Sequence, residues 1–216
     1  MRKTVTMSDG TALVARARTE FADIIDALSD EQLAMPTLCT GWTPHHVLAH
    51  LVTFIDIPLP KFMFNVMRSR GNFDAAADRM AQGLAERTVA DLTSSLRSKA
   101  SQGSKMPGFP PELSVADVVV HTQDVRRGLG LEGAPDEELL RTSLDFITAS
   151  KKAKLLVEQK GLFDGLRLEA TDFDWTYGDG TLVSGPAESL LMAAMRRPAM
   201  DELSGDGVET LRARLG

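Results

Sequence analysis

The sequence predicts a mainly α-helical protein that ends in a small module of mixed strands and helices. Through most of residues 1–160, apolar residues recur every three or four positions, which is typical of helices that bury one face. Over residues 166–170 the spacing changes to alternation, which is typical of a strand. We therefore expect a helical domain over residues 1–160 and a small α/β module over residues 161–216.

A helix that carries His50 has the clearest boundaries in the first domain. Thr43 is a good N-cap, and Pro44 fits the first helical position that follows it. Pro58 and Pro60 are expected to stop or kink this helix, because proline lacks the amide hydrogen that a helix interior needs. A long helical region follows over residues 74–100.

A second informative helix is predicted to begin at Ser114 and to end at Gly128 or Gly130. It carries Asp117 and His121 within an unusually apolar stretch. Further along, residues 166–170 read as a strand. Residues 175–177 and 181–183 flank the sequence Gly178-Asp179-Gly180, which predicts a hairpin turn.

Composition and charge exclude several classes of function. The formal net charge is −6, which argues against a nucleic-acid binder because phosphate recognition needs a basic face. The chain has a single cysteine, Cys39, so the fold cannot depend on an internal disulfide, and a reducing cytoplasm is the simplest compartment. No run of about 18 apolar residues occurs, so we expect no membrane partner.

Three side chains form the set most suited to chemistry. Asp117 and His121 are four residues apart, so they lie one above the other on a helix and can bind one ion from the same side. His50 lies on the apolar face of its own helix. Two imidazoles and one carboxylate leave coordination positions open for water or substrate, as catalytic metal sites do. Helical bundles commonly build such sites from facing helices.

Structural roles compete with this hypothesis. Asp117 has the spacing of a capping box that starts at Ser114, and His50 can be a buried core residue. Asp124 can orient a metal ligand or form a surface ion pair with Arg126 or Arg127. For the remaining residues the structural role is favoured. We expect Cys39 to be a small packed thiol and Trp42 to be a core residue. His45 and His46 are expected to form a solvated helix start.

Three segments resemble a known family. Residues 37–51 (TLCTGWTPHHVLAHL), residues 115–130 (VADVVVHTQDVRRGLG) and much of residues 165–215 resemble the mycothiol-dependent maleylpyruvate isomerase family. This family belongs to the DinB-like metalloprotein superfamily. The resemblance implies a DinB-like four-helix bundle followed by a small α/β C-terminal module.

The resemblance also implies a function. It implies a divalent metal, usually zinc, held by His50, Asp117 and His121, although the family usually has glutamate where this chain has Asp117. It implies mycothiol as co-substrate, so that a metal-activated thiolate carries out isomerase or S-transferase chemistry on a small electrophile. The alternative is a non-catalytic metal- or ligand-binding module with a degenerate site. Both of these functions are compatible with a homodimer.

Overall fold

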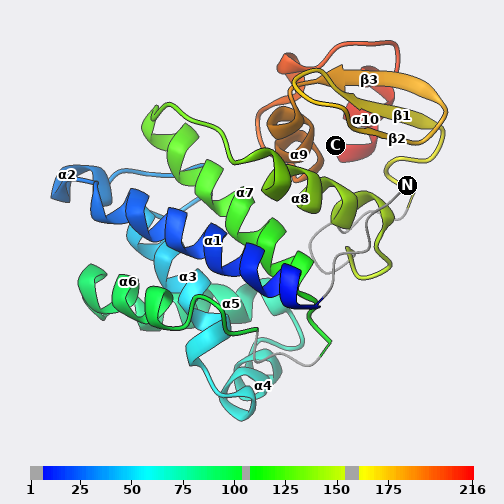
Figure 1. Ribbon diagram of the computed structural model, residues 1–216. Coiled ribbons are helices and arrows are strands. Elements are labelled where there is room, and N and C mark those ends of the chain that lie inside the picture. The colour runs from blue at the N-terminus through cyan, green and yellow to red at the C-terminus, as the bar shows by residue number, and fades with distance from the viewer. Residues whose placement is uncertain (1–6, 104–107, 154–160) are drawn as a thin grey trace. The chain divides into compact units, whose positions relative to one another are not determined.

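The structure, a computed structural model, describes residues 7–103, 108–153 and 161–216 (Figure 1). The described chain is mainly helical, with a small sheet near the C-terminus, which confirms the predicted fold class. The chain divides into two compact units, Met1–Ser114 with Asp124–Glu132 and Val115–Gln123 with Gly133–Gly216. The domain boundary predicted at residue 160 lies outside the described residues and stays a prediction.

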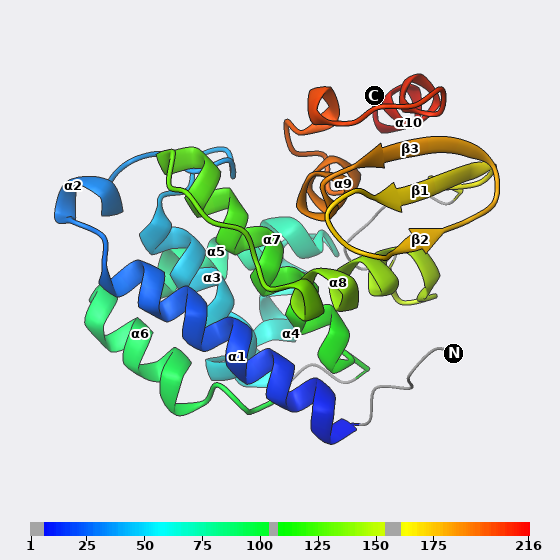
Figure 2. The ribbon, with the colours of Figure 1, turned by 45° about the horizontal axis from the view of Figure 1, so that its top comes forward.

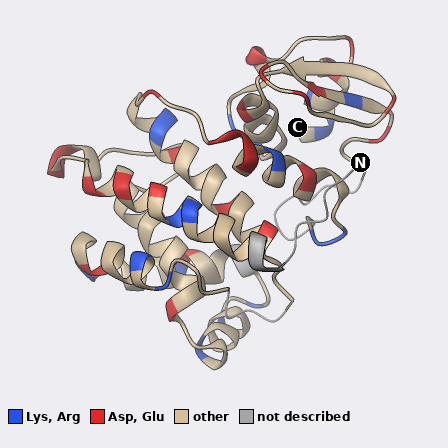
Figure 3. Ribbon diagram, viewed as in Figure 1, with Lys and Arg blue, Asp and Glu red and all other residues tan. Residues whose placement is uncertain are grey.

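The first unit is a bundle of helices built around α3. α3 packs against α5 and α6, and α1 packs against α6. The helices are α1 (Met7–Asp26), α2 (Asp30–Leu33), α3 (Pro44–Asp56), α4 (Leu59–Arg68), α5 (Phe73–Leu84) and α6 (Val89–Ser98). Acidic and basic residues are interspersed along the drawn helices (Figure 3). Among the described helices, none combines the length and apolar character needed to span a bilayer.

α3 begins where the sequence predicts. Thr43 is the N-cap, Pro44 is the first helical residue, and the Thr43 Oγ1 lies 2.9 Å from Nδ1 of His46. The helix ends before Pro58, but Pro58 then serves as the N-cap of α4. The sequence analysis missed this helix, because a proline that ends one helix is also well suited to the first turn of the next.

α7 (Pro111–Leu129) contributes its two ends to the first unit and Val115–Gln123 to the second. It begins at Pro111 and not at Ser114, so the predicted start is wrong by about one turn. Ser114 therefore lies inside the helix, and the capping-box role considered for Asp117 is excluded. The helix ends at Gly130, whose φ of 66° is the left-handed conformation expected of a C-terminal glycine.

The second unit combines helices with a mixed sheet. In the sheet, β1 lies between β2 and β3, antiparallel to β2 and parallel to β3 (Figure 2). α9 packs against α8, β1 and β3. Besides part of α7, the elements are α8 (Glu137–Ala149), β1 (Leu166–Ala170), β2 (Thr176–Tyr177), β3 (Thr181–Gly185), α9 (Ala187–Ala194), η2 (Met200–Glu202) and α10 (Val208–Leu215).

The hairpin predicted around Gly178-Asp179-Gly180 is wrong, because β2 and β3 each pair with β1 and not with each other. The glycines allow the chain to cross the start of β1 closely. A Cβ atom at Gly178 would lie 2.1 Å from the carbonyl oxygen of Leu166, and one at Gly180 would lie 1.9 Å from that of Gly165. The glycines thus mark a close backbone crossing, which has the same sequence signal as a tight turn.

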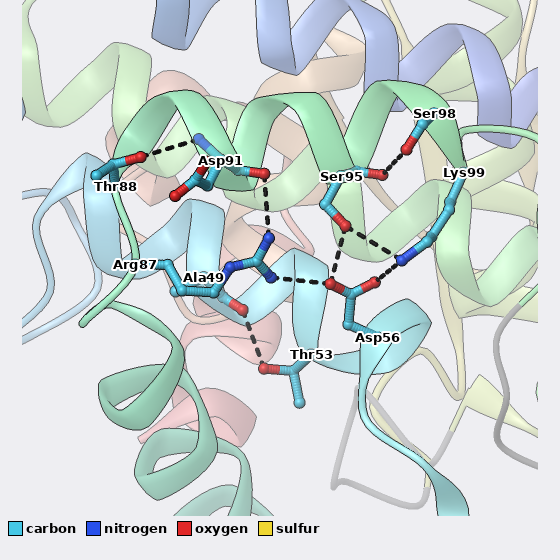
Figure 4. Close-up of polar contacts among 9 residues, drawn as sticks. All are labelled: Ala49, Thr53, Asp56, Arg87, Thr88, Asp91, Ser95, Ser98 and Lys99. Carbon is cyan, nitrogen blue, oxygen red and sulfur yellow. Dashed lines mark hydrogen bonds and ion pairs between the residues drawn. The ribbon is translucent and has the colours of Figure 1, made fainter.

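A charged cluster fixes the C-terminal end of α3 to α6 and the segment before it (Figure 4). Asp56 accepts hydrogen bonds from Lys99 Nζ at 2.5 Å, Ser95 Oγ at 2.8 Å and Arg87 Nη1 at 2.9 Å. Burial by itself raises the pKa of Asp56, but the bonds from Lys99, Ser95 and Arg87 outweigh it and hold the pKa below its ordinary value. The folded state therefore stabilises the ionised carboxylate.

Candidate metal centre

His50 lies in the middle of α3 and is 7% exposed. Its imidazole is flanked by two aromatic rings. The ring centroid of Trp42 lies 5.0 Å away with the planes tilted by 47°, and that of Phe54 lies 5.3 Å away in an edge-on arrangement. Phe54 in turn contacts Phe62 and Phe109 at centroid distances of 6.0 and 6.1 Å. Aromatic rings thus contact the first of the predicted ligands.

Asp117 and His121 are brought together on α7, as their spacing predicts. Nε2 of His121 lies 3.6 Å from Oδ1 of Asp117, and the two side chains are 12% and 16% exposed. The imidazole and the carboxylate are therefore close, mostly buried and on one face of the helix. This is the arrangement needed for two side chains to bind one cation from the same side.

Asp124 anchors α7 to the loop that precedes α3. Its carboxylate, fully buried, accepts a hydrogen bond from the Cys39 thiol at 3.0 Å, and its backbone oxygen accepts one from the amide of Leu38 at 3.1 Å. Asp124 is therefore not the surface residue that one of its two sequence interpretations required. Cys39 is partly buried and serves as a donor in this contact.

Gly128 brings α7 even closer to the same loop. A Cβ atom at Gly128 would lie 2.7 Å from Cα of Thr37, so any larger residue would collide with backbone. The loop is closed by its own hydrogen bonds, since the Trp42 carbonyl accepts from both the amide and the hydroxyl of Thr37. The C-terminal half of α7 is thus held against a compact loop that leads into α3.

The two other histidines have structural partners. His46 pairs with Thr43 at the helix start, and Nε2 of His45 lies 2.9 Å from the carbonyl oxygen of Arg87. Both are partly buried, so they are less exposed than the predicted solvated helix start.

Two sets of three side chains among the described residues carry donor atoms that could hold a metal ion: His50, Asp117 and His121, and Cys39, His121 and Asp124. The first set contains the three residues selected from the sequence. The second adds Cys39 and Asp124, which sequence reasoning did not connect because they lie 85 positions apart. Imidazole nitrogens with a carboxylate or a thiolate suit zinc and related divalent ions.

The fold and these side chains define a class: helical-bundle proteins with a candidate metal centre and an α/β C-terminal module. Residues 14–126, slightly more than half of the chain, match the sequence model of the mycothiol maleylpyruvate isomerase N-terminal domain. The chain therefore belongs to the mycothiol maleylpyruvate isomerase family.

One solved structure agrees with this assignment at the level of the fold. A histidine-to-alanine mutant of the mycothiol-dependent maleylpyruvate isomerase superposes with a TM-score of 0.58 and 16% sequence identity, and 93% of each chain is covered. Another structure of the mycothiol-dependent maleylpyruvate isomerase gives a TM-score of 0.49 and 19% identity, again covering 93% of each chain, which is too loose to add support. None of the curated protein sequences compared with this chain matches it.

Proposed function

We propose that the protein is a metal-dependent enzyme that uses a low-molecular-weight thiol, mycothiol, for isomerase or S-transferase chemistry on a small electrophile. His50, Asp117 and His121 would hold the ion, for which zinc is the first choice. Two imidazoles and a carboxylate fit zinc, and three protein ligands leave room for a thiol. A reducing cytoplasm suits such thiol chemistry.

The observation that carries this proposal is the shared face of α7. Asp117, His121, Asp124 and Gly128 follow one another in steps of four, three and four, which line up on one side of a helix. Asp124 and Gly128 lie against the loop of residues 37–42. Because α7 is unbroken, Asp117 and His121 continue this stripe toward the N-terminal end of the helix.

The same loop supports the choice of His50 as the third ligand. It ends at Trp42, whose ring packs on the His50 imidazole. The loop therefore contacts the α7 stripe at one end and His50 at the other. These contacts of the loop, with Asp124, with Gly128 and with His50, all lie within the first unit.

A bound divalent cation would supply positive charge that stabilises the thiolate form of a thiol at neutral pH. The aromatic side chains around His50 would exclude water from this thiolate, which strengthens it as a nucleophile. Addition to a conjugated cis double bond, rotation about the resulting single bond and departure of the thiolate give an isomer. If the enolate formed by the addition instead takes a proton from solvent, the new carbon–sulfur bond is retained and the product is a conjugate.

Zinc binding is the first test. Protein purified without a histidine tag is dialysed against Zn²⁺, and bound metal is measured for the wild type and for His50→Ala, Asp117→Ala and His121→Ala. His45→Ala is the matched control, because it removes an imidazole from the same helix without touching the proposed set. We expect one tightly bound ion in the wild type and the control, and weak binding in the three variants. No binding by the wild type contradicts the proposal.

Turnover is the second test. Zinc-loaded protein is mixed with mycothiol and maleylpyruvate, and the products are followed by nuclear magnetic resonance. A trans isomer or a stable thioether supports the proposed chemistry and distinguishes isomerase from transferase. If zinc binds but the absorbance of the mycothiol thiolate does not rise, the non-catalytic binding module becomes the better description.

A further inference from the structure

The indole of Trp42 is held by two contacts, one made by its ring and one made by its nitrogen. Its ring packs against the His50 imidazole, with ring centroids 5.0 Å apart. Its Nε1 donates a hydrogen bond of 2.8 Å to Oδ1 of Asp78 on α5. Asp78 is itself held, because its other oxygen accepts from Nε2 of Gln82 at 2.9 Å. These contacts form a continuous chain from α5 through Trp42 to His50.

Such a chain matters because a metal ligand must be held in one rotamer. Residues beyond the ligands commonly orient a ligating imidazole, and their loss weakens metal binding. A hydrogen bond to a carboxylate is stronger than a neutral one, so Asp78 holds the indole nitrogen of Trp42 in place. The indole ring then limits the rotation of the imidazole, which Phe54 also contacts in an edge-on arrangement.

We propose that Asp78, acting through Trp42, is a positioning residue that holds the His50 imidazole in its metal-binding orientation. This inference rests on the proposed function, since it assumes that His50 binds an ion. It assigns to Asp78 a role that its sequence context does not indicate, because Asp78 lies 36 positions from Trp42 on another helix.

The chain contains a matched control for this proposal. It has two tryptophans, and the second, Trp175, also donates through Nε1 to an aspartate, Asp145, at 3.0 Å. Trp175 and Asp145 belong to the second unit, whereas Trp42, Asp78 and His50 belong to the first. The variants Asp78→Ala and Asp145→Ala thus remove the same kind of bond from two different tryptophans.

The experiment measures the dissociation constant for Co²⁺ by calorimetry in the wild type and these variants. We expect Asp78→Ala to weaken binding about tenfold and Asp145→Ala to leave it within about twofold of the wild type. Asp78→Asn, which keeps an acceptor oxygen, should recover part of the loss. If Asp78→Ala binds as tightly as the wild type, the positioning role is overturned. If the wild type binds no Co²⁺, the proposed function fails instead.

Fluorescence gives a second readout, which tests whether the ion binds beside Trp42. In Trp175→Phe protein, Trp42 is the only tryptophan, so its emission reports directly on the ring beside His50. We expect Co²⁺ to quench this emission strongly and to quench Trp42→Phe protein much less. Equal quenching in both proteins overturns the proposal, because it means that the ion does not bind beside Trp42. The far-ultraviolet circular dichroism of each variant verifies that it is folded.

Discussion

Asp56 and His50 lie on the same helix, α3, yet their surroundings differ in kind. Asp56 is surrounded by donors from one neighbouring region: Arg87, Ser95 and Lys99 all reach its carboxylate (Figure 4). His50 is flanked by the rings of Trp42 and Phe54. One ionisable group is thus matched by charge within the protein, while the other is oriented by packing.

This difference separates a structural role from a binding role. A partly buried carboxylate whose oxygens accept from a lysine, a serine and an arginine has its charge balanced by the fold and little capacity for a ligand. An imidazole held by aromatic planes is fixed in direction, which is what a metal ligand requires. The two residues should therefore respond in opposite ways to substitution.

The largest expected effect is on metal binding by His50→Ala. Loss of a direct ligand should exceed the loss caused by outer residues, so we expect the dissociation constant for Zn²⁺ to rise by more than about 100-fold. Asp56→Asn should leave this constant unchanged. Competition with a chromophoric chelator measures both values. Equal Zn²⁺ affinity of His50→Ala and the wild type would remove the contrast between the two residues.

Asp56→Asn should instead lower the free energy of unfolding, by about 2 kcal/mol, because Lys99 and Arg87 lose a charged acceptor. The control is Asp23→Asn. Asp23 pairs with Arg97, but its side chain is 63% exposed, so its loss should cost less than about 1 kcal/mol. Urea unfolding of the metal-free proteins gives both numbers. If Asp56→Asn costs no more free energy of unfolding than Asp23→Asn, the charged cluster does not stabilise the fold.

Gly128→Ala tests the contact between α7 and the loop before α3. The added methyl group would meet the backbone of Thr37, and overpacking of this kind should destabilise the protein by about 1–2 kcal/mol. The same change at Gly83 in α5 meets no atom within 4 Å. Gly83→Ala should therefore stabilise the protein, by up to about 1 kcal/mol, because alanine is the better helix former. Thermal unfolding compares the two variants.

Gly128→Ala should also weaken zinc binding, because it displaces the stripe that carries Asp117 and His121 from the loop that contacts His50. Gly83→Ala should not. A destabilised Gly128→Ala protein with wild-type zinc affinity would show that the approach of α7 to this loop matters for folding alone.

Local signals in the sequence were sufficient for features that depend on neighbouring residues. Thr43 and Pro44 define the start of α3, and the four-residue spacing of Asp117 and His121 brings them together. Together with the family resemblance, this spacing identified the candidate ligands. The capping signal at Ser114 gave a wrong helix start, because Pro110 and Pro111 begin the helix one turn earlier.

Features that depend on distant residues could not be predicted. The bond between Trp42 and Asp78 and that between Cys39 and Asp124 each join side chains that no periodicity relates. Likewise, the glycines at 178 and 180 signal a turn, whereas their actual role is to let two backbone segments approach. Local chemistry specifies helix ends and faces, but tertiary packing decides which faces meet.

The smallest expected effect is the pH dependence of the contribution that Asp56 makes to the free energy of unfolding. Because its pKa is lowered in the folded state, Asp56 stabilises the protein above the unfolded-state pKa of about 3.9, and this contribution is lost as the pH falls through the lower folded-state value. The difference in unfolding free energy between the wild type and Asp56→Asn should thus be constant near neutral pH and shrink in acid. Urea unfolding over this range measures it. A difference that persists unchanged in acid would mean that the stabilising contacts of Asp56 depend on shape and not on charge.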